Sequence, residues 1–154
     1  YEEDCKVSVI FFNMSEENLA RILKWDSVMI GSDSSLRSLE GVLNYGKPHP
    51  RGYGTFSRVI RKYVNETSIL SIEEAIYKMT GFPAQTLGLK DRGILKEGFF
   101  ADITIFDQET IAEQATFTSP HNYSTGIKHV LVNGKLTIND GKHESVTNGA
   151  ILKK

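Results

Sequence analysis

Residues 6–33 read KVSVIFFNMSEENLARILKWDSVMIGSD, and this stretch decides the fold class. The apolar runs at 6–12 and 28–30 predict two buried strands. Between them, Ser15 is a good helix N-cap and is followed by an apolar stripe, formed by Leu19, Ile22 and Leu23. A strand, an amphipathic helix and a second strand in this order predict a βαβ unit, and therefore a parallel sheet.

The next part of the chain alternates between loop and helix signals. Residues 34–56 carry four glycines and two prolines without a sustained period, which predicts a long loop. The pattern FSRVIRKYV at 56–64 predicts a helix, and the capping box of Ser71 and Glu74 opens another one. We expect Gly81 and Pro83 to end that helix and a short helical turn to follow at 84–87.

After Gly88 the pattern changes to the alternation that is typical of strands. The stretch GILKEGFFADITIFD at 93–107 predicts a turn at Glu97 and Gly98 followed by a strand. Asn133 and Gly134 lie between two alternating segments, as in a β-hairpin with a type I′ turn. The sequence thus predicts an α/β part over residues 1–90 and a mostly β part over residues 91–154.

Composition excludes several classes of protein. The chain has 154 residues, 40% of them hydrophobic, with 18 Lys+Arg against 19 Asp+Glu, which is enough apolar sequence for a packed core. Neither half carries the basic excess of a nucleic-acid-binding surface. Because no apolar run reaches membrane-spanning length and no signal peptide is apparent, we expect a cytoplasmic protein with no membrane partner. The chain begins at Tyr1, and we expect it to begin within a longer protein.

Asp33 is the first candidate for a functional residue. It follows the second predicted strand, and functional groups of parallel α/β folds gather at the carboxyl ends of strands. A carboxylate at this position could bind a divalent metal or act as a general base. The alternative is an aspartate that caps the following turn.

His49 and Arg51 are the next candidates, in the segment KPHPRGYGTF at 47–56. The flanking prolines favour an extended backbone. Arg51 could bind a carboxylate bidentately, and His49 could be a ligand or an acid–base group. The alternative is a stiff surface loop with a solvated arginine.

The other histidines and the single cysteine carry weaker signals. No His-x-His or His-Glu-x-x-His spacing occurs, so we interpret the remaining histidines as structural or surface residues: His121, His129 and His143. Cys5 has no neighbour in sequence that would lower its pKa, which argues against a nucleophilic role.

Four segments in a fixed order resemble a known family. They are GSDSS at 31–35, KPHPRGYGTFSRVIRKYV at 47–64, LSIEEAIYKMTGFPAQTLGLKDRGILKEGFFADITIFD at 70–107 and ATFTSPHNYSTGIKHVLVNGK at 115–135. Together they resemble the C-terminal part of the D-aminoacylase (N-acyl-D-amino-acid deacylase) family of the amidohydrolase superfamily. The resemblance covers nearly the whole chain, from about Val9 to Gly149.

The resemblance implies a (β/α)8 metal-dependent hydrolase barrel with a small β-sandwich domain. Residues 1–90 would supply the last strands and helices of the barrel, and residues 91–154 the C-terminal share of the sandwich. Asp33 matches the aspartate at the end of strand eight, which serves the metal centre as ligand or proton carrier. Arg51 matches a residue that contacts the substrate carboxylate, with His49 beside it.

The implied reaction is the zinc-dependent hydrolysis of an N-acyl-D-amino acid to a D-amino acid and a carboxylate. The family's His-x-His and cysteine ligands have no counterpart in this sequence, so we expect this chain alone to be inactive and not to hold zinc tightly. We also expect self-association through exposed strand edges. The alternative is a freestanding, non-catalytic binding module derived from an amidohydrolase.

Overall fold

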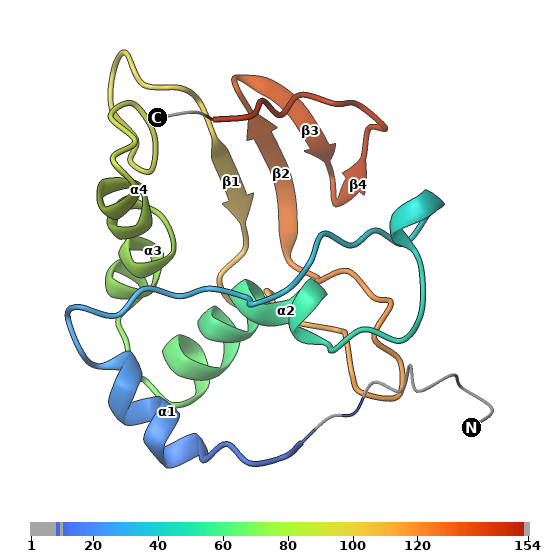
Figure 1. The fold of residues 1–154 in the computed structure, drawn as a ribbon. Helices are drawn as coiled ribbons and strands as arrows, with labels where there is room; N and C mark the ends of the chain where they lie inside the picture. Colours follow the sequence, from blue (N-terminus) through green and yellow to red (C-terminus); the bar gives the residue numbers. More distant parts are fainter. Residues whose placement is uncertain (1–8, 10, 153–154) are drawn as a thin grey trace.

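The computed structural model describes residue 9 and residues 11–152. Along the chain, a group of helices is followed by an antiparallel sheet (Figure 1). The described elements, in chain order, are α1 (Glu16–Leu23), η1 (Gly41–Leu43), α2 (Arg51–Arg58), η2 (Val59–Glu66), α3 (Ile72–Met79), α4 (Gly81–Leu87), β1 (Ile103–Phe106), β2 (Ile127–Val132), β3 (Lys135–Asn139) and β4 (Lys142–His143). In the part of the chain that the structure describes, no helix is long and apolar enough to cross a membrane.

Two helices begin where their sequence signals predict. Ser15 caps α1, and its Oγ accepts a hydrogen bond from the Asn18 N–H at 3.4 Å. The capping box at α3 is complete, because Ser71 Oγ accepts from the Glu74 N–H and the Glu74 carboxylate accepts from the Ser71 N–H, at 3.1 and 2.8 Å. These signals act within one turn, so they do not depend on the rest of the fold.

Two other helices begin earlier than the sequence predicts. The expected loop at 34–56 ends at Pro50, and α2 starts at Arg51, then continues without a break into the π-helix η2. Pro50 has a φ of −54°, which suits the first turn of a helix. Likewise α4 starts at Gly81, with Pro83 in the first turn. Proline is tolerated there because N–H groups of the first turn have no acceptor within the helix.

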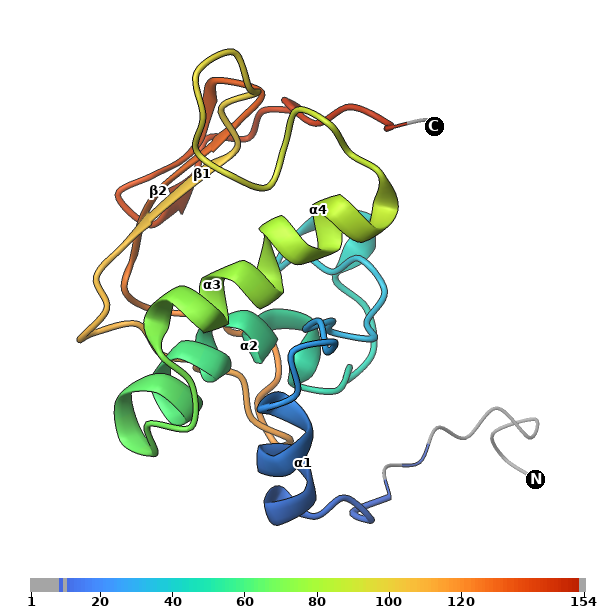
Figure 2. The same ribbon diagram turned by 90° about the vertical axis from the view of Figure 1, so that its left-hand side faces the viewer.

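The main core lies where α1, η2 and α3 meet (Figure 2). It consists of side chains that are at least nine-tenths buried: Leu23, Val59, Tyr63, Val64, Leu70 and Ala75. This core fixes η2, and with it α2, whose first residues carry one of the candidate side chains.

The expected βαβ unit with a parallel sheet is not formed in the described residues. The run at 6–12 lies mostly outside them, and residues 28–30 are not part of a sheet. The Ile30 N–H instead donates to the Lys78 carbonyl at 3.1 Å. A parallel strand needs the backbone of a neighbouring strand, and no described segment supplies one here.

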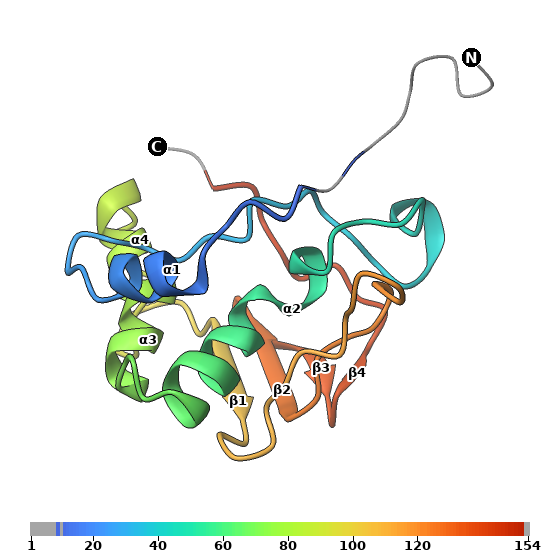
Figure 3. The ribbon, with the colours of Figure 1, turned by 90° about the horizontal axis from the view of Figure 1, so that it is seen from below.

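The sheet that the structure does show is antiparallel, with strand order β1-β2-β3-β4. The predicted hairpin joins β2 to β3, and both turn residues have the positive φ of a type I′ turn, 51° at Asn133 and 75° at Gly134. The connection between β1 and β2, residues 107–126, is long and runs back alongside α2 (Figure 3). It brings the second half of the chain to the candidate site.

Candidate functional site

Asp33 and Arg51 form an ion pair, with 3.0 Å between Asp33 Oδ2 and Arg51 Nη2. The aspartate lies in the segment after residues 28–30, and the arginine is the first residue of α2. The Asp33 side chain is 90% exposed and that of Arg51 44% exposed, so both groups are open to a ligand. The two residues that the sequence singled out most strongly therefore lie together.

Gly52 explains how the start of α2 comes so close to this segment. A Cβ on Gly52 would lie 2.9 Å from Ser34 Oγ and 3.4 Å from Arg37 Cγ. A larger residue would push the two segments apart, so a glycine in the first turn of the helix allows the approach that joins Arg51 to Asp33.

His49 contacts the backbone of Arg51. Its Nδ1 accepts a hydrogen bond from the Arg51 N–H at 3.1 Å, and its ring packs edge-on against Phe117 with 4.9 Å between centroids. Burial lowers the pKa of His49, and the positive charge of Arg51 lowers it further. Since Nδ1 must lack a proton to accept, this geometry favours the neutral ring with its proton on Nε2.

The loop between the two candidates, residues 34–50, receives contacts that the sequence did not reveal. His121 Nε2 lies 2.8 Å from the Gly46 carbonyl oxygen, and the Tyr123 hydroxyl accepts from the Leu39 N–H at 3.2 Å. The interpretation of His121 as a structural residue agrees with this contact, but its target could not be read from the sequence. His129 and His143 lie in the sheet and accept backbone N–H groups there.

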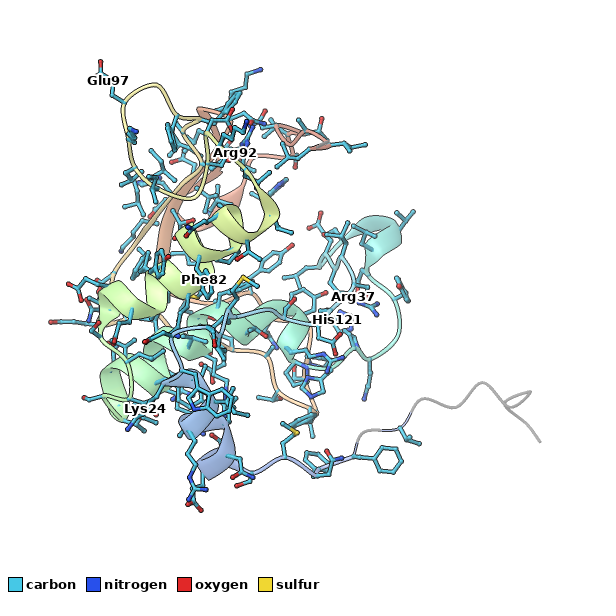
Figure 4. The ribbon with its side chains drawn as sticks, turned by 60° about the vertical axis from the view of Figure 1, so that its left-hand side comes forward. Lys24, Arg37, Phe82, Arg92, Glu97 and His121 are labelled. Carbon is cyan, nitrogen blue, oxygen red and sulfur yellow. The ribbon has the colours of Figure 1, made fainter. Side chains whose placement is uncertain are left out.

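Arg37 is a second arginine near the site. Its guanidinium lies 4.2 Å above the Tyr45 ring, and Nη1 donates to the Tyr45 carbonyl at 3.2 Å. The loop residue next to Tyr45, Gly46, is the one that His121 contacts; both side chains, Arg37 and His121, are labelled in Figure 4. Arg37 thus connects two parts of the loop at 34–50.

The described residues do not by themselves form a metal site. No three or more His, Cys, Asp or Glu side chains lie close enough together in residues 9 and 11–152 to hold an ion. Asp33 offers a single exposed carboxylate, whereas a hydrolytic zinc ion takes about three protein ligands. Cys5 lies outside the described residues. A metal could be bound here only with additional ligands.

Comparison with known proteins places the chain in a family. Residues 26–138 match the model of the amidohydrolase family, so the chain belongs to that family. Among curated relatives, N-acyl-D-glutamate deacylase of Alcaligenes xylosoxydans xylosoxydans is 43% identical over 130 residues, which is 84% of this chain and 25% of the relative. D-aminoacylase of the same organism is 42% identical over 125 residues, 81% of this chain and 24% of the relative. The chain thus spans about a quarter of the length of these relatives.

Solved structures give the same assignment. The fold matches a crystal structure of D-aminoacylase with a TM-score of 0.84 and 37% identity, over 94% of this chain and 29% of that one. It also matches N-acyl-D-glutamate deacylase from Bordetella bronchiseptica, solved with zinc and a phosphonate inhibitor, with a TM-score of 0.72 and 37% identity over 88% and 28%. Another matching D-aminoacylase structure concerns a binuclear metal centre. The resemblance of this chain to D-aminoacylases is therefore confirmed. The related structures are those of metal-dependent enzymes.

Proposed function

We propose that this chain is the C-terminal part of a metal-dependent hydrolase that cleaves the amide bond of N-acyl-D-amino acids. Three curated relatives at 40–43% identity are deacylases for such compounds. The observation that carries the proposal is the Asp33–Arg51 pair, which brings a proton-accepting group and a carboxylate-binding group to one place. On this proposal, residues 1–90 complete a barrel and residues 91–154 contribute to a β-sandwich.

Arg51 would bind the carboxylate of the amino-acid substrate. Its guanidinium can grip a carboxylate with two parallel hydrogen bonds, and it already holds the Asp33 carboxylate. Because both side chains are well exposed, this ion pair contributes only about 0–1 kcal/mol. An incoming substrate carboxylate can therefore replace Asp33 on Arg51 at little cost.

Asp33, once released from Arg51, would move the proton of the reaction. It accepts a proton from the attacking water as the new C–O bond forms at the acyl carbon, and it returns that proton to the nitrogen as the C–N bond breaks. The products are a carboxylate and a D-amino acid. Asp33 is also the residue that we assign as a metal ligand, although the described residues do not fit a zinc ion without ligands from elsewhere.

His49 would support Arg51 in substrate binding. Its Nδ1 fixes the Arg51 N–H, and its ring is packed between that turn and Phe117. In this role His49 holds the backbone of Arg51 in place and so positions its side chain. The Nε2–H of His49 is left to donate to the substrate carboxylate.

The proposal is tested with the complete polypeptide that contains this sequence and with the chain alone. Release of free D-amino acid is measured with N-acetyl-D-glutamate, N-acetyl-D-aspartate and N-acetyl-D-leucine, before and after metal removal by a chelator. We expect metal-dependent release by the complete polypeptide and none by the chain alone. Binding of these compounds by the chain alone, with no hydrolysis by either preparation, would instead support the freestanding, non-catalytic module.

The same preparations test self-association. We expect the chain alone to elute from a sizing column as an oligomer, since Phe11 and Phe12 stay 76% and 79% exposed. The edge-on contact of Phe12 with the Phe117 ring, at 4.9 Å between centroids, leaves most of its surface open. A strictly monomeric chain that unfolds cooperatively would contradict this expectation.

A further inference from the structure

The β1–β2 connection, residues 107–126, contacts the loop at 34–50 through three side chains. His121 reaches the Gly46 carbonyl at 2.8 Å, and Tyr123 accepts from the Leu39 N–H at 3.2 Å. Phe117 packs against the His49 ring at 4.9 Å between centroids. These contacts lie along the loop from near its start to its end, directly before Arg51.

The loop needs such partners because little of its backbone is in regular structure. Within the described residues it contains one short turn of helix, η1, and many of its N–H and C=O groups have no helical or sheet partner. The Ser38 carbonyl accepts from the Tyr53 hydroxyl at 2.8 Å, next to the Leu39 N–H that Tyr123 binds. Side chains from other elements therefore satisfy backbone groups of the loop and restrict its conformation.

The connection is itself fixed on α2 and η2 by several side chains. At its start, the Gln108 carbonyl accepts from Asn65 Nδ2 at 2.6 Å. Near its middle, the Glu113 carboxylate accepts from Arg58 Nη1 at 3.0 Å and from Arg61 Nε at 2.7 Å. Near its end, Ser124 Oγ lies 2.6 Å from the buried Ser57 Oγ. The residues that contact the loop lie between the attachments at Glu113 and Ser124.

Gly54 permits the attachment at Glu113. A Cβ at this position would lie 2.7 Å from Glu113 Cβ, closer than real side chains approach. The two glycines of the Arg51-Gly-Tyr-Gly stretch thus have separate roles, since Gly52 faces the segment after Asp33 and Gly54 faces the connection.

We infer that the β1–β2 connection positions the substrate-binding loop, with Tyr123, His121 and Phe117 as positioning residues for His49 and Arg51. This inference rests on the proposed function for its effect on the reaction, but the contacts themselves do not. None of the three residues touches Asp33 or Arg51 in the described contacts, so they act through the loop. Substrate affinity should depend on them, and the proton transfer at Asp33 should not.

The contacts are tested by hydrogen–deuterium exchange on the complete polypeptide with Tyr123→Phe and, separately, His121→Ala. Each variant removes one hydrogen-bond partner of the loop, so amide exchange over residues 34–50 should become about threefold to tenfold faster. Exchange over α3 and α4 should not change. Equal exchange in the wild type and both variants would overturn the inference.

Two substitutions serve as matched controls. Tyr77→Phe removes a hydroxyl that also makes a 3.2 Å hydrogen bond, to Gln85 Oε1, but within α3 and α4. His143→Ala removes a ring that accepts the Ser145 N–H at 3.0 Å in the sheet. Neither should change exchange in the loop; a loop that responds equally to all four variants would show a general loss of stability and overturn the inference.

Steady-state kinetics test whether the loop acts through Arg51. Tyr123→Phe should raise KM about threefold to tenfold and leave kcat within about twofold of the wild type. In an Arg51→Lys background it should have little further effect on KM, because the group that it positions is already impaired. Faster exchange with an unchanged KM, or full additivity with Arg51→Lys, would overturn the positioning role. Absence of any hydrolysis by the wild type would refute the proposed function, whereas the exchange result would still decide the contacts.

Discussion

Glu113→Gln should destabilise the protein by about 2–3 kcal/mol. The Glu113 side chain is only 12% exposed, and its carboxylate is held by both Arg58 and Arg61. Hydrogen bonds between charged groups contribute about 1.5–3 kcal/mol each. The bond to Arg58 counts for less because that arginine is 41% exposed. Glutamine keeps one acceptor oxygen but loses the charge, so the two-pronged contact with Arg61 is the main loss.

The effect of Glu113 should also depend on pH in a defined direction. Burial alone would raise the pKa of Glu113, but hydrogen bonds and positive charge from Arg61 and Arg58 outweigh it and hold the pKa below its usual value. A carboxyl whose pKa is lowered in the folded state stabilises that state fully above its unfolded pKa, about 4.3, and this contribution is lost as the pH falls through the folded value. The difference between wild type and variant should be constant near neutral pH and shrink below about pH 4.3.

Urea unfolding followed by circular dichroism measures both effects, at pH 7 and then at lower pH. Glu17→Gln is the control, because Glu17 pairs with Arg21 but the two side chains are 74% and 70% exposed. Its cost should be below about 0.5 kcal/mol. If Glu113→Gln were as mild as Glu17→Gln, or if its effect persisted unchanged well below pH 4, the account of this carboxylate would be wrong.

Three further predictions concern the reaction of the complete polypeptide. Asp33→Asn should lower kcat by about 10²–10⁴-fold. The free energy of unfolding should change little, since the Asp33 side chain is 90% exposed and asparagine also tolerates its φ of 48°. An unchanged kcat would contradict the role of Asp33. Arg51→Lys should raise KM at least about tenfold, because lysine cannot bind a carboxylate bidentately, and initial rates over a range of substrate concentrations measure this. KM should also rise as the pH falls through the pKa of His49, which burial lowers from its usual 6.5. The reason is that a proton on Nδ1 removes the acceptor of the Arg51 N–H. His49→Gln should abolish this pH dependence.

Local sequence signals predicted much of the fold correctly. The capping box at Ser71 and the type I′ turn at Asn133 and Gly134 each depend on a few adjacent residues, and both are present. The strand expected at 28–30 is wrong for the described structure, since its hydrogen bonds depend on a neighbouring strand that periodicity cannot supply. The early start of α2 is also non-local, because two glycines that read as loop residues allow close approach to other segments.

The candidate site could be predicted only in part for a related reason. Asp33 follows an apolar run and Arg51 lies between proline and glycine signals, so both stood out in the sequence, and the structure joins them. The contacts of His121 and Tyr123 join residues 75 and 84 positions apart, and no local pattern indicates them. A loop that lacks regular backbone hydrogen bonds implies that partners exist, without saying where in the chain they lie.

The two kinds of ion pair in this region suit two different tasks. The Asp33–Arg51 pair is exposed, so on the proposed function a substrate carboxylate would exchange with Asp33 and leave it free to accept a proton. The pairs of Glu113 with Arg58 and Arg61 are more buried, so breaking them is costly and the β1–β2 connection stays in place. If both pairs were equally exposed, the loop would be free to move away when Arg51 exchanged partners; if both were equally buried, Asp33 could not leave. On the proposed function, the difference in burial would let Arg51 exchange its partner while its surroundings remain fixed. Glu113→Gln combined with Tyr123→Phe should therefore raise KM more than either change alone.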